Sequence, residues 1–142
     1  MTQIQPVHAT TVARYDQGRW RAVMLLGPSG AGKSDLGLRL IGRGWRLVSD
    51  DYTRVWAFQE ALYATAPVQI AGRIEARGVG IVSVETRLIA RVVLTVACVP
   101  EAVERLPEPQ TRRFEGVDLP LFALDPRLPS APDMVDAALL TL

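Results

Sequence analysis

Short apolar runs separated by turn residues predict a chain that is built mostly of strands. Residues 7–15 alternate loosely and are rich in β-branched and aromatic side chains, and residues 20–26 form a second apolar run. The sequence Asp16-Gln17-Gly18 between them is typical of a tight turn. We therefore expect an N-terminal hairpin whose second strand is buried.

Helical periodicity follows this hairpin. Leu36, Leu40 and Ile41 share one face of a helix expected over about residues 33–41, and the glycines that follow end it. Further strands are expected over residues 45–49, 53–57, 62–65, 69–74 and 91–99, with a turn at residues 59–60. The last of these strands is the most apolar segment and is expected at the centre of the sheet.

Prolines become frequent after residue 106, so long regular elements are not expected there. We expect a short helix or turn over residues 101–106, one strand over residues 119–124 and a C-terminal helix over residues 133–140, with Ser130 as its N-cap. Together these elements predict an α/β fold: one domain, residues 1–142, with a mixed β-sheet and few helices.

A phosphate-binding pattern lies between the hairpin and the first helix. It consists of Gly27, Pro28, Ser29, Gly30, Ala31, Gly32, Lys33 and Ser34. The glycines allow successive backbone N–H groups to point at one anion, and the helix N-terminus adds partial positive charge. Lys33 would contact the outer phosphates and the Ser34 hydroxyl would bind Mg²⁺. A chance glycine-rich turn is the alternative, but the strand before and the helix after it favour a nucleotide or another polyphosphate.

Two carboxylates, Asp50 and Asp51, directly follow the strand expected over residues 45–49. A parallel strand after the loop and helix would bring them to the same rim of the sheet as the phosphate loop. Phosphoryl transfer often uses one carboxylate to accept a proton and another to bind metal or orient a neighbour. The alternative is a solvated pair that caps a turn.

Three further residues have both a structural and a functional interpretation. His8, the only histidine, is either a surface or half-buried residue or, if the hairpin runs beside the loop strand, a neighbour of the phosphates. Glu75 and Arg77 fit a cross-strand ion pair. The glycines at positions 78 and 80 instead indicate a special backbone path near a ligand.

Composition narrows the function classes. A net charge of +1 gives no reason to expect nucleic acid or an anionic membrane as partner. No apolar run is long enough to span a membrane, and the N-terminus lacks the features of a signal peptide, so a cytoplasmic location is expected. Cys98, the single cysteine, is expected to be an inert core thiol.

Taken in order, four features resemble the catalytic domain of HPr kinase/phosphorylase. They are Val7-His8, the loop over residues 27–34, the strand that ends in Asp50-Asp51, and Ile74-Glu75-Ala76-Arg77-Gly78-Val79-Gly80-Ile81. The similarity covers about residues 7–106. Its most specific part is the loop followed by Asp-Asp and E-x-R-G-x-G. The resemblance implies a fold similar to that of phosphoenolpyruvate carboxykinase and a ring-type homo-oligomer.

The resemblance also implies an activity: phosphorylation of a serine on an HPr-type phosphocarrier protein with ATP and Mg²⁺, and a phosphate-dependent reverse reaction. Asp51 would accept the serine proton, and Ser34 with Glu75 would bind Mg²⁺. The residues with a catalytic role by this resemblance are His8, Lys33, Asp51 and Arg105, with Asp50 and Arg77 in support.

Two departures from the family pattern are visible. The chain resembles the short form of the enzyme, with only a few residues before His8 and extra hairpin length over residues 15–19. The family's late basic segment, tied to dephosphorylation, is replaced by Leu-Pro-Leu-Phe-Ala-Leu-Asp-Pro-Arg at residues 119–127. Two alternatives of other classes remain: a small-molecule kinase with the same loop, and a non-catalytic nucleotide sensor.

Overall fold

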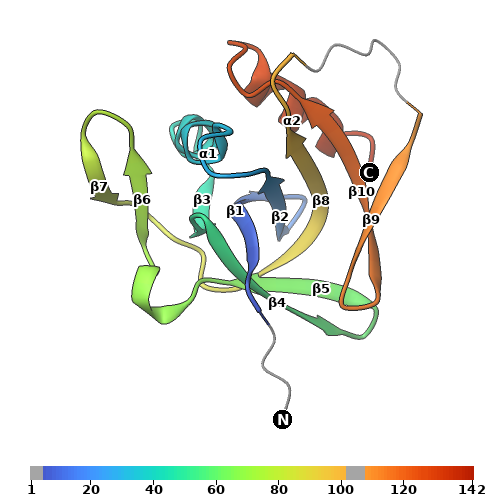
Figure 1. The fold of residues 1–142 in the computed structure, drawn as a ribbon. Helices are drawn as coiled ribbons and strands as arrows, with labels where there is room; N and C mark the ends of the chain where they lie inside the picture. Colours follow the sequence, from blue (N-terminus) through green and yellow to red (C-terminus); the bar gives the residue numbers. More distant parts are fainter. Residues whose placement is uncertain (1–4, 102–107) are drawn as a thin grey trace.

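The computed structural model describes residues 5–101 and 108–142, which form a strand-rich α/β fold with a mixed sheet (Figure 1). The strands are β1 (Val7–Asp16), β2 (Arg19–Leu26), β3 (Arg46–Ser49), β4 (Tyr52–Phe58), β5 (Ala61–Thr65), β6 (Arg73–Ala76), β7 (Gly80–Ser83), β8 (Ala90–Cys98), β9 (Gln110–Phe114) and β10 (Val117–Leu124). The helices are α1 (Lys33–Ile41), α2 (Ala131–Leu139) and a 3-10 turn, η1 (Val68–Ile70). The predicted fold class is confirmed.

Tight turns join three of the strand pairs. The β1–β2 turn has φ values of 51° at Gln17 and 78° at Gly18, and the β4–β5 turn has 49° at Gln59 and 65° at Glu60. Positive φ at both central residues matches the right-handed twist of the flanking strands. Both turns were predicted, whereas the third, between β9 and β10, was not.

Five strands of the large sheet close into a ring. The pairing order is β2-β1-β4-β5-β8, and β8 also pairs with β2 in parallel, while β10 and β9 extend the sheet from β8. The predicted central place of the apolar strand is therefore confirmed. β3 lies on the other side of β1 from β2 and is antiparallel to β1, so β2 and β3 run in the same direction. Their ends consequently reach the same rim, as expected.

Alternate positions of β1 face different parts of the core. Ala9 and Ala13 pack with Met24 and other residues on one face, whereas Val12 packs with Leu36 and Leu40 of α1 on the other. The helix crosses β1 closely, since a Cβ added at Gly37 would lie 3.0 Å from the Thr10 methyl group. By the same alternation, His8 and Thr10 lie on the face of β1 that α1 covers.

The structure corrects three expectations. Residues 69–74 do not form one strand, because η1 and the tight turn at Gly72 (φ 79°) precede β6. The proline-rich region does contain one long strand: β10 has eight residues, includes Pro120 and pairs with the unpredicted β9. Ser130 is the N-cap of α2, but its side chain makes no capping hydrogen bond, and the helix runs over Ala131–Leu139.

The helix or turn expected over residues 101–106 lies mostly outside the described residues. Within the described part of the chain, no helix combines the length and the hydropathy that crossing a membrane requires.

Candidate functional site

The loop over residues 27–34 leaves β2 and enters α1 by way of three glycines in the left-handed region. Gly27, Gly30 and Gly32 have φ values of 150°, 84° and 100°. The Ala31 N–H donates to the Pro28 carbonyl at 3.1 Å, and the first α1 hydrogen bond runs from Leu36 N–H to Gly32 at 3.0 Å. The N-terminus of α1 therefore lies directly behind the loop.

Neighbouring segments pack closely against Gly27 and Gly32, the two outer glycines of this loop. A Cβ at Gly27 would lie 3.3 Å from the Cys98 carbonyl at the end of β8, and one at Gly32 would lie 3.0 Å from the Pro126 ring. Burial raises the pKa of the Cys98 thiol to about 12, against a smaller opposing effect of Lys33, which fits the predicted inert core thiol.

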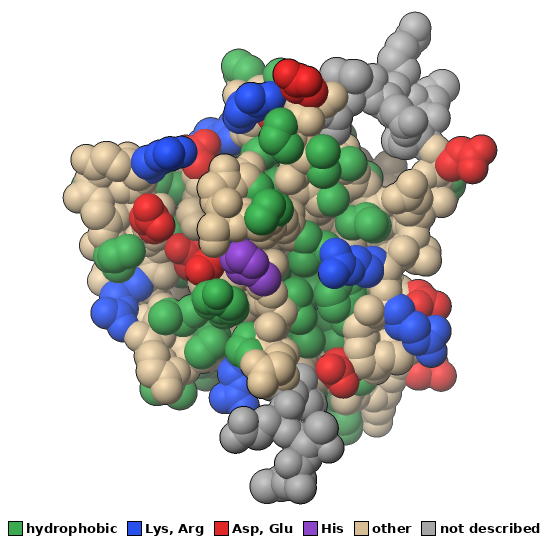
Figure 2. Space-filling view, viewed as in Figure 1, with side chains coloured by type: hydrophobic (Ala, Val, Ile, Leu, Met, Phe, Trp, Pro, Cys, Tyr) green, Lys and Arg blue, Asp and Glu red, His purple; other side chains and the backbone are tan. Residues whose placement is uncertain are grey.

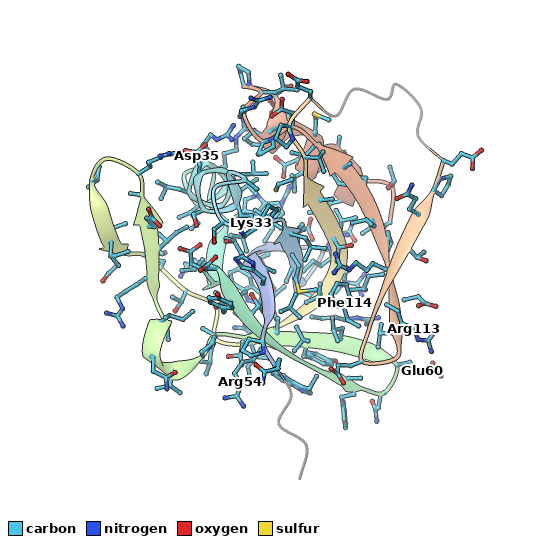
Figure 3. The ribbon with its side chains drawn as sticks, viewed as in Figure 1. Lys33, Asp35, Arg54, Glu60, Arg113 and Phe114 are labelled. Carbon is cyan, nitrogen blue, oxygen red and sulfur yellow. The ribbon has the colours of Figure 1, made fainter. Side chains whose placement is uncertain are left out.

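Lys33 is the cation at the base of the loop (Figure 3). Its side chain is only 4% exposed, and its ammonium group donates to the Pro28 carbonyl at 3.0 Å. The same nitrogen lies 3.9 Å from Asp51 Oδ1 and 3.5 Å from His8 Nε2. The positive charge of this buried ammonium group is therefore compensated by the Pro28 carbonyl and the Asp51 carboxylate.

Asp50 is the hydrogen-bonding centre of the site. Its Oδ1 accepts from Ser34 Oγ at 2.6 Å and from Thr10 Oγ1 at 2.9 Å, and its Oδ2 accepts from the Glu75 N–H at 3.1 Å. One buried carboxylate thereby joins the phosphate loop, β1 and β6. The sequence had assigned Asp50 only a supporting role, because no pattern revealed that three separate segments converge on it.

Asp51 is the more accessible carboxylate, with 44% of its side chain exposed. Its φ of 67° is uncommon for a residue other than glycine, and its N–H donates to Thr10 Oγ1 at 3.2 Å. Its Oδ1 accepts from His8 Nε2 at 2.8 Å. The structure therefore brings together His8, Lys33 and Asp51, and His8 is both half-buried and a neighbour of the phosphate loop. Figure 2 shows His8, the single purple side chain, at the surface beside acidic side chains.

A pocket of about 590 Å³ opens over these residues. The phosphate loop and the start of α1 form one side, Asp50, Asp51 and Tyr52 form the base, and the β6–β7 hairpin forms the other side. This hairpin is a separate two-stranded sheet that stands beside α1 in Figure 1. Glu75 and Arg77 both line the pocket from it, and neither takes part in an ion pair among the described residues. The cross-strand ion pair considered above is thus absent from that part of the chain.

The donor set around the pocket fits a hard cation. Ser34 offers a hydroxyl whose proton is directed to Asp50, so its lone pairs are free for another partner, and the Glu75 carboxylate lines the same pocket. In the described residues, no group of three histidine, cysteine, aspartate or glutamate side chains is placed to hold a metal. Mg²⁺ usually takes one or two side chains and completes its shell with phosphate and water oxygens, which suits this arrangement.

An ion pair between the buried carboxylate of Asp125 and the exposed side chain of Arg127 stabilises the turn that covers Gly32. Asp125, directly after β10, accepts from Arg127 Nε at 3.0 Å, Arg127 Nη2 at 2.9 Å and the N–H of Glu101 at 3.0 Å. These hydrogen bonds, that of the Arg127 side chain above all, hold the pKa of the Asp125 carboxyl well below its usual range. Arg39 of α1 also donates to the Leu128 carbonyl at 3.1 Å in this turn. No short sequence pattern predicts this contact. The predicted catalytic residue Arg105 lies outside the described residues.

The model of the HPr Serine kinase C-terminal domain matches residues 1–99 of the chain. The chain belongs to this family. A fold comparison agrees: the structure of the Hpr(Ser) kinase/phosphatase from Coxiella burnetii superposes with a TM-score of 0.81, covering 97% of this chain and 95% of that chain at 23% identity. The predicted resemblance is therefore confirmed.

Two curated relatives show how far the similarity in sequence extends. The HPr kinase/phosphorylase of Levilactobacillus brevis is 39% identical over 85 residues, which are 59% of this chain and 26% of the relative. That of Caldanaerobacter subterraneus is 42% identical over 81 residues, 56% of this chain and 25% of the relative. The match thus spans about a quarter of the length of these relatives. β9, β10 and α2 lie beyond the residues that the family model matches.

Proposed function

We propose that this chain is a phosphotransferase that uses ATP and Mg²⁺ to phosphorylate a serine hydroxyl of an HPr-type phosphocarrier protein. One observation carries the proposal: the exposed carboxylate of Asp51 opens on the pocket of the phosphate loop, 3.9 Å from Lys33 Nζ and 2.8 Å from His8 Nε2. Family membership supports it, since the curated relatives are named HPr kinase/phosphorylase.

The phosphate loop would bind the donor. The N–H groups of the loop and the Lys33 ammonium would contact the phosphate oxygens and stabilise the charge that develops during transfer. Lys33 donates to the Pro28 carbonyl at the base of the loop, and a phosphate oxygen would be a further acceptor for its ammonium group. A magnesium ion held by Ser34 and Glu75, with Asp50 orienting the Ser34 hydroxyl, would neutralise charge on the phosphates.

Asp51 would act as the general base. The serine O–H proton passes to the carboxylate while the serine oxygen bonds to the terminal phosphorus and the bond from that phosphorus to ADP breaks. His8 donates to Oδ1 of Asp51 and leaves Oδ2, which has no hydrogen-bond partner among the described residues, for the incoming hydroxyl. Run in reverse with inorganic phosphate as acceptor, the same groups would return the proton to serine and release pyrophosphate. A ring-type homo-oligomer and a cytoplasmic location stay predictions.

Incubation with labelled ATP, Mg²⁺ and purified HPr tests the proposal. We expect label on a serine of HPr, loss of transfer by roughly two orders of magnitude or more in Asp51→Asn with nucleotide affinity nearly unchanged, and weaker nucleotide binding in Lys33→Ala. Asp118→Asn, an exposed carboxylate on β10, is the matched control. Transfer that survives Asp51→Asn would contradict the assignment of the base. Label on a metabolite without any carrier protein would indicate a small-molecule kinase, and binding without turnover would indicate a nucleotide sensor.

A further inference from the structure

Tyr52 lines the pocket beside Asp50 and Asp51. It is the first residue of β4 and the register partner of His8 in the antiparallel pairing of β1 with β4. Side chains of directly opposed residues in such a pair lie on the same face of the sheet. The Tyr52 ring is therefore placed against the imidazole by the strand pairing itself.

The two rings stack nearly in parallel. Their centroids are 5.1 Å apart and their planes make an angle of 16°. The Tyr52 backbone is fixed on both sides, because its N–H donates to the Asp50 carbonyl at 2.7 Å and its carbonyl accepts from the Ser49 hydroxyl. With 47% of Tyr52 exposed, the ring is not there to fill the core. Its closest aromatic partner among the described residues is His8.

The stacked Tyr52 ring gives the His8 imidazole a contact across one of its faces. The His8 side chain is 36% exposed, so the ring is not enclosed by the core on all sides. Its polar contacts among the described residues are both at one atom: Nε2 lies 2.8 Å from Asp51 and 3.5 Å from Lys33. Polar contacts at a single atom do not define the tilt of the ring about that atom. A flat aromatic surface against one ring face restricts this tilt and favours offset, parallel geometry.

We propose that Tyr52 is a positioning residue that holds the His8 imidazole in the plane from which Nε2 reaches Asp51. The consequence for transfer rests on the proposed function, whereas the ring geometry does not. The aromatic ring carries the effect and the hydroxyl does not, because the stacked faces make the contact. Tyr52→Phe should therefore preserve the arrangement, and Tyr52→Leu should lose it.

Imidazole NMR tests the geometry without any activity assay. The chain contains one histidine, so its ring resonances need no further assignment. We expect an NOE between the ring protons of His8 and Tyr52 in the unmodified protein, and His8 ring protons that move downfield in Tyr52→Leu and stay in place in Tyr52→Phe. Tyr15→Leu is the matched control, an exposed tyrosine on β1 that contacts Trp20 instead. A missing NOE, or resonances that Tyr52→Leu leaves in place, would overturn the proposal.

Kinetics test the consequence. We expect kcat for transfer to fall roughly three- to tenfold in Tyr52→Leu, with the KM for nucleotide unchanged and with rates in Tyr52→Phe and Tyr15→Leu within about twofold of the unmodified protein. Equal kcat in Tyr52→Leu and Tyr52→Phe would overturn the role in catalysis. If the unmodified protein transfers no phosphate, the proposed function fails, and the NMR result still decides whether Tyr52 orients His8.

Discussion

Replacing Asp50 by asparagine should remove the connection between the phosphate loop, β1 and β6. The carboxylate accepts three hydrogen bonds, two at Oδ1 and one at Oδ2. An asparagine whose oxygen takes the Oδ1 position keeps the first two as weaker neutral bonds. Its NH₂ group then faces the N–H of Glu75, donor against donor, so the third bond is lost and a buried N–H is left without a partner.

The expected loss of stability in Asp50→Asn follows from these three hydrogen bonds. Hydrogen bonds to a charged group contribute about 1.5–3 kcal/mol and neutral ones about 0.5–1.5 kcal/mol, so losing one and weakening two costs several kcal/mol. Relief of repulsion from the adjacent Asp51 offsets part of this. We expect the free energy of unfolding to fall by about 2–3 kcal/mol, and the Tm to fall by roughly 4–12 °C for a chain of this size.

Urea denaturation of Asp50→Asn, with Asp118→Asn as control, measures the difference. Asp118 pairs with Arg113 at 3.3 Å, and both side chains are more than half exposed, so its loss should change the free energy by less than about 1 kcal/mol. Hydrogen exchange at the Glu75 amide should also become faster in Asp50→Asn alone. If the two variants have equal stability and the Glu75 amide keeps its protection, the inference that Asp50 joins three segments is refuted.

Three further outcomes are expected. Gly32→Ala should lower the free energy of unfolding by about 1–3 kcal/mol more than Gly44→Ala does. Both glycines have φ near 100°, but only a Cβ at Gly32 would meet a neighbouring side chain, the Pro126 ring. Thermal melts of the two variants measure the difference. The pKa of the Asp125 carboxyl is lower in the folded chain than in the unfolded one, so its ionisation stabilises the fold at pH values above roughly 4. This stabilisation is lost as the pH falls toward the folded-state pKa. Arg127→Gln should therefore make the free energy of unfolding, measured by denaturation at several acidic pH values, depend less on pH. Cys98, with its pKa raised to about 12, should resist a thiol reagent at pH near 8 until urea unfolds the chain.

The parts of the fold predicted correctly are those whose signals are local. The hairpin of β1 and β2, the loop over residues 27–34 and α1 are each specified by neighbouring residues. β9 was missed because its five residues, Gln110–Phe114, are polar except at the end and lie at the sheet edge, where no apolar alternation is required. The strand predicted over residues 119–124 was placed correctly, but β10 begins two residues earlier, at Val117. Pro120 does not interrupt it, because the pairing with β8 begins only at Leu121, so no N–H donor to β8 is needed at Pro120.

For the site, residue types were predictable and their connections were not. An ammonium, a hydroxyl and a carboxylate are typical groups for binding phosphate, binding a metal and accepting a proton. Lys33, Ser34 and Asp51 could therefore be assigned these roles from residue type alone. The stack of Tyr52 on His8 depends on which residues of β1 and β4 are opposed, and that register follows from long-range pairing. The turn at Asp125 reaches Gly32 only because β10 runs parallel to β8, a relation that no short pattern encodes.

The pairing of β2 with β8 has a consequence for how the molecule is made. Residues 21–26 lead into the phosphate loop, yet their parallel neighbours are residues 91–97, which a ribosome adds much later. A growing chain can form the β1–β2 hairpin early, but its loop lacks the carbonyl of Cys98 against which Gly27 packs until β8 has been synthesised. Loop closure over such a separation slows folding. The nucleotide affinity proposed for this loop should therefore appear abruptly during synthesis, once β8 docks, rather than growing with chain length.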